Sequence, residues 1–121
     1  MQFLFAADRG TPGLAGRYDF LSPPVLELLA DLAARCAAAG VKLSVCGEHA
    51  SRPLEAMTLV GLGITSLSMP ASGLFPVKAL LAELDLGGFR RVLDGIRRTA
   101  SGAASVREPL AAWAREHGLP I

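Results

Sequence analysis

The sequence is poor in cysteine, in aromatic residues and in net charge. It contains two cysteines in 121 residues, and 12 Lys plus Arg against 11 Asp plus Glu leave a formal net charge of +1. The only adjacent basic pairs are Arg90 with Arg91 and Arg97 with Arg98, which argues against the basic face that a nucleic-acid-binding protein needs. Few cysteines and no basic-then-apolar leader predict a reduced, cytoplasmic protein.

Hydrophobic residues are abundant, at 51% of the chain, and this is enough for one folded domain over residues 1–121. The stretch from Ala56 to Val77 carries no charged residue and is long enough to suggest a membrane span. Three glycines and two prolines interrupt it. We therefore expect this stretch to form a buried helix and strand, and we expect no membrane partner.

The clearest helix is predicted from Ser22 to Ala39. Ser22 can cap its amino end, Pro23 suits its first turn, and Gly40 follows its last residue. One face repeats apolar residues at helical spacing: Val25, Leu28, Leu29, Leu32 and Cys36. This pattern predicts that Cys36 packs in the core.

Two short segments are predicted to be strands, Val41 to Cys46 and Ile64 to Met69. A helix from Pro53 to Leu62 separates them, and another helix is expected from Gly73 to Glu83 with Pro76 in its first turn. The alternation of helices and strands predicts a parallel sheet in an α/β fold.

The last part of the chain, residues 85–121, has a helical pattern throughout. One apolar stripe consists of Phe89, Val92, Leu93 and Ile96. A second helix is expected after Ser105, which could form a capping box with Glu108.

Polar residues follow the first predicted strand directly. Functional residues gather at the carboxyl ends of parallel strands, so Cys46, Gly47 and Glu48 are expected on the functional rim, with Met69 at the end of the next strand. Two strands, however, are too few to close a barrel.

Four segments together resemble a known family. In order and spacing, "QFLFAADRG", "YDFLSPPVLELL", "VCGEHASRPLEAMTLVGLGITSLSM" and "PVKALL" are similar to the last third of the phosphoenolpyruvate (PEP)-binding barrel of phosphoenolpyruvate-protein phosphotransferases, the enzyme I family of the bacterial phosphotransferase system. The nitrogen-related paralogue is the most similar branch. The resemblance implies the carboxyl-terminal part of a (β/α)8 barrel over residues 1–84, followed by a helical tail over residues 85–121.

The resemblance also implies a role for Cys46. In this family the phosphoryl group of PEP passes to a protein histidine, and a cysteine protonates the enolate to give pyruvate. A thiol with an ordinary pKa of about 8.5 is mostly protonated near neutrality and can still act as a general acid. His49 leaves an alternative open, because a Cys46–His49 pair would make the thiol a nucleophile instead.

Two further substrate-site residues follow from the same resemblance. Asp8 and Arg9 match the family's Asp-Arg-Gly element, in which the arginine binds substrate oxygens. Spacing alone favours the alternative that Arg9 pairs with Asp8 or another exposed acid, and the resemblance reverses this preference. Glu48 matches the family pattern and could orient Cys46 or a neighbouring arginine, or it could simply stabilise a helix end.

Other parts of the family's machinery are expected before this chain begins. These are the Mg²⁺ ligands, one of them in an Asn-Asp-Leu element, and the domain whose histidine takes the phosphoryl group and passes it to a phosphocarrier protein. The chain contains no asparagine. We therefore expect a fragment that is inactive alone.

Two alternatives remain open. The chain could be a non-catalytic interaction or oligomerisation module derived from this barrel, or a relative of pyruvate phosphate dikinases and PEP synthases. Exposed sheet edges, and apolar side chains without an opposing layer, predict a homo-oligomer or a loosely packed monomer. The apolar side chains expected to be exposed are Val41, Leu43, Ile64 and Leu67.

Overall fold

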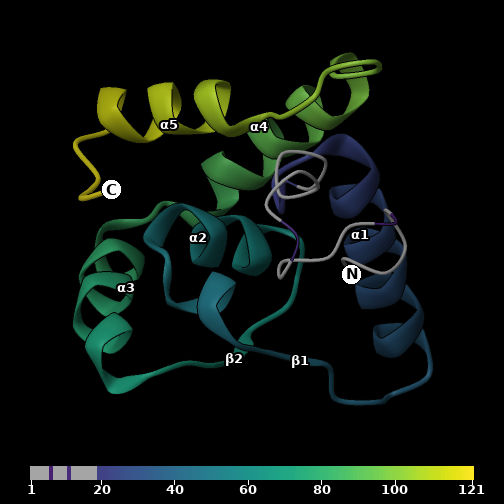
Figure 1. Cartoon of the computed structure of the whole chain (residues 1–121), viewed down its shortest axis with the longest axis horizontal. Coiled ribbons are helices and arrows are strands. Elements are labelled where there is room, and N and C mark those ends of the chain that lie inside the picture. Colours follow the sequence, from purple (N-terminus) through teal and green to yellow (C-terminus); the bar gives the residue numbers. More distant parts are fainter. Residues whose placement is uncertain (1–5, 7–10, 12–18) are drawn as a thin grey trace.

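A computed structural model describes Ala6, Thr11 and residues 19–121 of the chain, and Figure 1 shows the arrangement of its elements. Six helical elements and two strands follow one another in these residues: α1 (Pro23–Ala38), β1 (Ser44–Cys46), the 3-10 helix η3 (Glu48–Ser51), α2 (Pro53–Gly61), β2 (Ser66–Ser68), α3 (Ala71–Glu83), α4 (Leu86–Thr99) and α5 (Arg107–Glu116).

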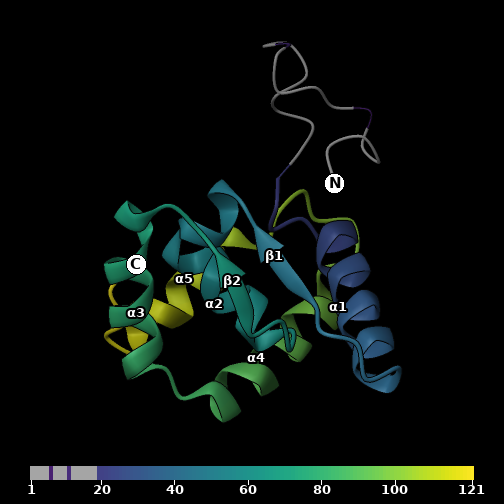
Figure 2. The ribbon, with the colours of Figure 1, turned by 90° about the horizontal axis from the view of Figure 1, so that it is seen from below.

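The strands β1 and β2 are parallel neighbours, with Ser44 opposite Ser66 and Cys46 opposite Ser68. Figure 2 shows the two strands side by side, with α1 beyond β1 and α3 beyond β2. The predicted parallel α/β arrangement is therefore confirmed, although each strand is shorter than expected. The described residues form a two-stranded sheet and not a closed barrel, because closure needs strands that these residues do not supply.

The two faces of the sheet differ in chemistry. Val45 and Leu67 are half-buried and pack against the hydrophobic core. The opposite face is exposed and carries small polar side chains and one thiol: Ser44, Cys46, Ser66 and Ser68. The alternation follows from the two-residue period of a strand, which turns successive side chains to opposite faces.

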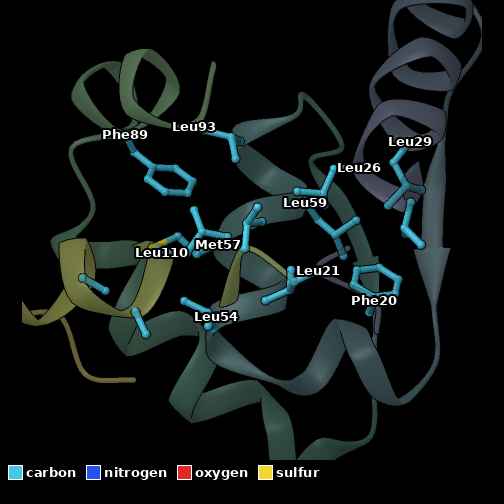
Figure 3. Packing of buried hydrophobic residues seen from close by; sticks show 14 of the residues in the cluster. Phe20, Leu21, Leu26, Leu29, Leu54, Met57, Leu59, Phe89, Leu93 and Leu110 are labelled. Carbon is cyan, nitrogen blue, oxygen red and sulfur yellow. The ribbon is translucent and has the colours of Figure 1, made fainter. Parts of the chain in front are cut away.

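The helix α2 lies at the centre of the molecule. Figure 1 shows α4 and α5 on one side of α2 and the sheet on the other. The core cluster joins side chains from α1, α2, α4 and α5, and Figure 3 shows Leu26, Met57, Leu59, Phe89 and Leu110 converging in it. The helical tail is thus part of the same core as the β/α segment.

The expected apolar surface is mostly covered. Ile64 is only 1% exposed, and Leu43 and Leu67 are half-buried against the core. Val41 is 59% exposed. The prediction that all four side chains lack an opposing layer was therefore wrong for Ile64 and too strong for Leu43 and Leu67, because α1, α2 and the tail supply that layer.

The helix α1 begins at Pro23 as predicted, but its details differ. Ser22 occupies the N-cap position without a side-chain capping bond. Only the first half of the predicted apolar face is covered, since Leu32 is 38% exposed and Cys36 is half-buried. The prediction that Cys36 is a core residue was too strong, because α1 extends past the elements that pack on it.

Two other helix ends also differ from expectation. The helix α3 begins at Ala71, so Pro76 lies inside it and not in its first turn. The N-cap of α5 is Val106, and the Ser105 hydroxyl accepts a hydrogen bond from the Arg107 amide. The predicted capping box is absent, because Glu108 pairs with Arg115 instead.

The uncharged stretch from Ala56 to Val77 contains most of α2, all of β2 and the first half of α3. Among the described residues, no helix combines the length and the apolar character that crossing a bilayer requires.

Candidate functional site

Cys46 ends β1, at the carboxyl edge of the parallel pair. Its side chain is exposed on the polar face of the sheet, beside its cross-strand partner Ser68. The next amide, that of Gly47, donates a hydrogen bond of 3.2 Å to the Ser68 carbonyl and so extends the ladder past the thiol. Hydrogen bonds of the strand ladder therefore hold the backbone at Cys46, while its side chain faces solvent.

Gly47 makes the turn that follows the strand. Its φ of 113° and ψ of −171° lie in a region that only glycine adopts readily. The chain then enters η3, in which the Ala50 amide donates to the Gly47 carbonyl and the Ser51 hydroxyl donates to the Glu48 carbonyl at 2.6 Å. A tight turn and a single helical turn thus fix the direction in which the chain leaves Cys46.

The helix α3 supports this loop from one side. A Cβ atom added at Gly73 would lie 2.4 Å from Cβ of Ser51, so the two backbones approach as closely as a glycine allows. Gly73 is buried, and it provides a packing contact that any larger residue would break. The position of the loop therefore depends on the register of α3 as well as on its own turn.

Glu48 forms an ion pair with Arg52, the last residue of the loop. The Oε1 to Nη2 distance is 2.5 Å, and the two side chains are 74% and 48% exposed. An exposed pair of this kind contributes little to stability, but it holds the Arg52 guanidinium next to the rim of the sheet. Of the roles considered from the sequence, contact with a neighbouring arginine is the one that this geometry favours.

His49 points toward the core side of the loop. Its ring stacks on Phe20 with centroids 4.5 Å apart and planes 13° apart. Burial, and next the positive charge of Arg52, lower the pKa of His49 below its usual 6.5. The neutral imidazole is therefore favoured at neutral pH, and it lacks the charge that would stabilise a Cys46 thiolate.

A buried carboxylate lies directly behind the loop. Glu55 in α2 is 1% exposed, and its Oε1 accepts a 2.9 Å hydrogen bond from Nη2 of Arg107. The same Nη2 donates to Oδ1 of Asp19 at 3.1 Å, and Nη1 of Arg52 lies 3.9 Å from Glu55. One charged network therefore connects the loop, α2, α5 and the segment before α1.

Two members of this network, Asp19 and Arg107, have pKa values displaced from their usual ones. Burial alone would raise the pKa of Asp19, but hydrogen bonds from Ser105, Leu21 and Arg107 outweigh it and lower the pKa. Burial alone would lower the pKa of Arg107, but hydrogen bonding and charge from Glu55 and Asp19 raise it. Asp19 and Arg107 are thus both held in their charged forms.

Sequence reasoning missed this network. Its one local signal was Glu55, the single charged residue in the helix "PLEAMTLVG". Such a residue is either paired or misplaced, because an isolated buried carboxylate is very costly. Its partner could not be read from the sequence, since Arg107 lies 52 residues away.

Some predicted residues fall outside the structural description. Asp8 and Arg9 lie outside the described residues. Within Ala6, Thr11 and 19–121, no three His, Cys, Asp or Glu side chains are grouped as a metal site.

Comparison with known proteins gives a consistent result. The family model described as "PEP-utilising enzyme, PEP-binding domain" matches residues 1–86. A phosphoenolpyruvate-protein phosphotransferase from Streptomyces coelicolor is 41% identical over 83% of this chain and 18% of its own length. A Salmonella typhimurium protein named phosphoenolpyruvate-dependent phosphotransferase system is 34% identical over 98% of this chain and 16% of its own length.

A relative that is named for a different reaction also matches the chain. A phosphoenolpyruvate synthase from Pyrococcus furiosus is 34% identical over 68% of this chain and 10% of its own length. No solved structure matches the chain significantly. The chain spans less than a fifth of the length of each of these three relatives.

Proposed function

Because the chain belongs to the PEP-binding domain family of the PEP-utilising enzymes, we propose that it is the carboxyl-terminal part of a phosphoenolpyruvate-protein phosphotransferase. In this proposal a longer protein binds PEP, transfers its phosphoryl group to a protein histidine and protonates the resulting enolate to pyruvate. The observation that carries the proposal is the position of Cys46, exposed at the carboxyl end of a parallel strand.

Cys46 is proposed as the proton donor. When the phosphoryl group leaves PEP, the electron pair of its bridging bond remains on the enolate oxygen. The methylene carbon then takes a proton from the Cys46 thiol, and the thiolate regains a proton from water. The rigid Gly47 turn supports this role, because protonation at carbon requires a donor held over one face of the enolate.

Two side chains are proposed to assist. Arg9 would bind phosphate or carboxylate oxygens of PEP, as the family resemblance implies. Glu48 would act through Arg52, whose guanidinium it holds at the rim of the sheet. We propose that the Mg²⁺ ligands and the phosphohistidine belong to other parts of the same longer protein. A separate phosphocarrier protein is its proposed partner, and its proposed location is the cytoplasm.

A second candidate is a non-catalytic assembly module. It is favoured by one observation, that the outer edges of both β1 and β2 are unpaired within the part of the chain that the structure describes. A related PEP-utilising reaction is a weaker alternative, supported by the similarity to a PEP synthase.

The decisive experiment uses a protein in which the missing part of the barrel and the phosphohistidine domain are present. We expect Cys46→Ala to abolish pyruvate formation while PEP binding changes by no more than a few-fold. Cys36→Ala is the matched control, because this half-buried thiol lies on α1, away from the rim, and its loss should leave turnover unchanged. Pyruvate turnover that survives Cys46→Ala at saturating PEP would rule out the thiol as the proton donor.

A further inference from the structure

The tail of the chain reaches the candidate site from outside the family match. Residues 87–121 lie beyond the region that the PEP-binding domain model covers. Yet Arg107, the first residue of α5, contacts the buried carboxylate of Glu55 just behind the loop that follows Cys46. The tail therefore supplies a charge to a part of the molecule that the family model covers.

The position of Arg107 is fixed independently of its ion pairs. The Val106 amide donates a 2.8 Å hydrogen bond to the Leu21 carbonyl, and the Leu21 amide donates to Oδ1 of Asp19 at 3.0 Å. The side chains of Val106 and Leu110 are buried in the core. Backbone pairing and apolar packing thus hold the start of α5, and with it the backbone of Arg107, in addition to the ion pairs of its side chain.

One nitrogen atom of Arg107 joins two carboxylates. Its Nη2 lies 2.9 Å from Glu55 and 3.1 Å from Asp19, and the two hydrogens of that nitrogen can serve one acceptor each. Glu55 has only one other cation nearby, Arg52 at 3.9 Å, among the residues that the structure describes. Without Arg107, Arg52 would be the one arginine left beside the buried carboxylate in the described part of the chain, with His49 also within reach of its charge.

Arg52 is the link to the site. Its Nη2 atom binds Glu48 at 2.5 Å while its Nη1 atom faces Glu55. A carboxylate that has lost its main partner is strongly destabilised when buried, and it will attract the nearest remaining cation. Movement of Arg52 toward Glu55 would break its bond to Glu48 and loosen the turn that holds Cys46.

We propose that Arg107 is a positioning residue for the candidate site: by neutralising Glu55, it leaves Arg52 free to hold Glu48 and so keeps the loop after Cys46 in place. The helical tail is then a working part of the site and not an appendage. The link to enolate protonation rests on the proposed function, whereas the effect on the loop is a property of this chain.

The test uses the 121-residue chain. The hydrogen exchange of amides 47–52 is measured under conditions where near-ultraviolet circular dichroism shows a folded chain. The amides of Gly47, Ala50 and Arg52 are hydrogen-bonded in the structure, and we expect Arg107→Gln to raise their exchange rates about threefold or more, because the loop opens more often.

Two matched variants separate positioning from general stability. Leu93→Ala removes a buried side chain from α4, outside the network, and so destabilises the chain. Arg115→Gln removes an exposed ion pair with Glu108 from α5. At an equal folded fraction, we expect both variants to keep the loop exchange rates of the parent chain.

Equal loop exchange in Arg107→Gln and Leu93→Ala would overturn the proposal, because the arginine would then act only through overall stability. A slower rate in Arg107→Gln would overturn it as well. The outcome is independent of catalysis: loop opening in Arg107→Gln together with turnover surviving Cys46→Ala would uphold the loop mechanism and refute the proposed function. Unchanged loop exchange in Arg107→Gln together with loss of turnover in Cys46→Ala would refute the loop mechanism and uphold the proposed function.

Discussion

The ring of Phe89 packs directly on Gly61. A Cβ atom added to Gly61 would lie 2.6 Å from Cε1 of Phe89 and 2.8 Å from Cδ2 of Leu93. This contact lets α4 approach the end of α2 so closely that the tail and the β/α segment share one core.

We therefore expect Gly61→Ala to destabilise the chain by about 1–3 kcal/mol, because the new methyl group overpacks the contact with Phe89. Urea unfolding followed by Trp113 fluorescence would measure the change. The matched control is Gly95→Ala in α4, where an added Cβ would meet nothing within 4 Å. That change should stabilise the helix by up to about 1 kcal/mol. A neutral Gly61→Ala would show that α4 can shift away at no cost.

Gly47→Ala should strain the turn after Cys46. The backbone at φ of 113° is costly for any residue with a Cβ, by about 1–3 kcal/mol, although the space around it is open. We expect lower stability and a moved thiol, seen as altered chemical shifts at residues 46–52. Gly95→Ala is again the control. Unchanged shifts would indicate that the turn tolerates side chains.

The two thiols should react at different rates. Cys46 is exposed and Cys36 is half-buried on α1, so a thiol reagent should label Cys46 several-fold sooner in the folded chain, because access limits the reaction. Peptide mass spectrometry over a time course would show the order. In denaturant the difference should disappear, and equal rates in the folded chain would contradict the described exposure.

His49 should make stability depend on pH. Its pKa is lowered on folding, so between the usual value of 6.5 and the lower folded value the unfolded chain binds more protons. The stabilisation is complete above pH 6.5 and is lost as the pH falls toward the folded pKa.

Unfolding curves from pH 7.5 to 5 would test this effect. We expect His49→Phe, which can keep the stack on Phe20, to flatten the decline across this window. His117→Gln, at the end of α5, serves as the control and should keep it. An identical decline in His49→Phe would assign the pH dependence to other groups.

The open sheet edges should promote association. Val41 is 59% exposed next to β1, and unpaired strand edges favour pairing between chains. We expect sedimentation velocity to show a concentration-dependent dimer or larger species, weakened about tenfold by Val41→Lys. Lys78→Ala, on the exposed surface of α3, is the control. A monomer at all concentrations would show that this chain shields its own edges.

The order of elements could be predicted from the sequence because its signals are local. Pro23 and Pro53 begin helices, Gly40 and Gly63 follow helix ends, and short alternating runs mark both strands. The position of Cys46 at a strand end followed from the same signals. Each depends on backbone preferences that act over a few residues, and tertiary packing did not override them.

Other features were decided only by the tertiary structure. The capping role of Ser22 and the burial of Leu32 depend on which elements pack nearby. The helix α1 extends past the elements that pack on it, so Leu32 is partly exposed. The number of strands in the sheet is likewise a property of the whole assembly of segments, so two strands predicted correctly did not determine closure.

The charged network shows most clearly what could not be predicted from the sequence. Glu55 meets Arg107 across 52 residues, and Arg107 meets Asp19 across 88. The sequence by itself determined that Cys46 ends a strand and that the chain belongs to the PEP-binding domain family. Only the tertiary structure decided that α5 neutralises the carboxylate behind it, because pairing between distant charges depends on how the apolar faces of α2 and α5 pack, and no local pattern encodes that geometry.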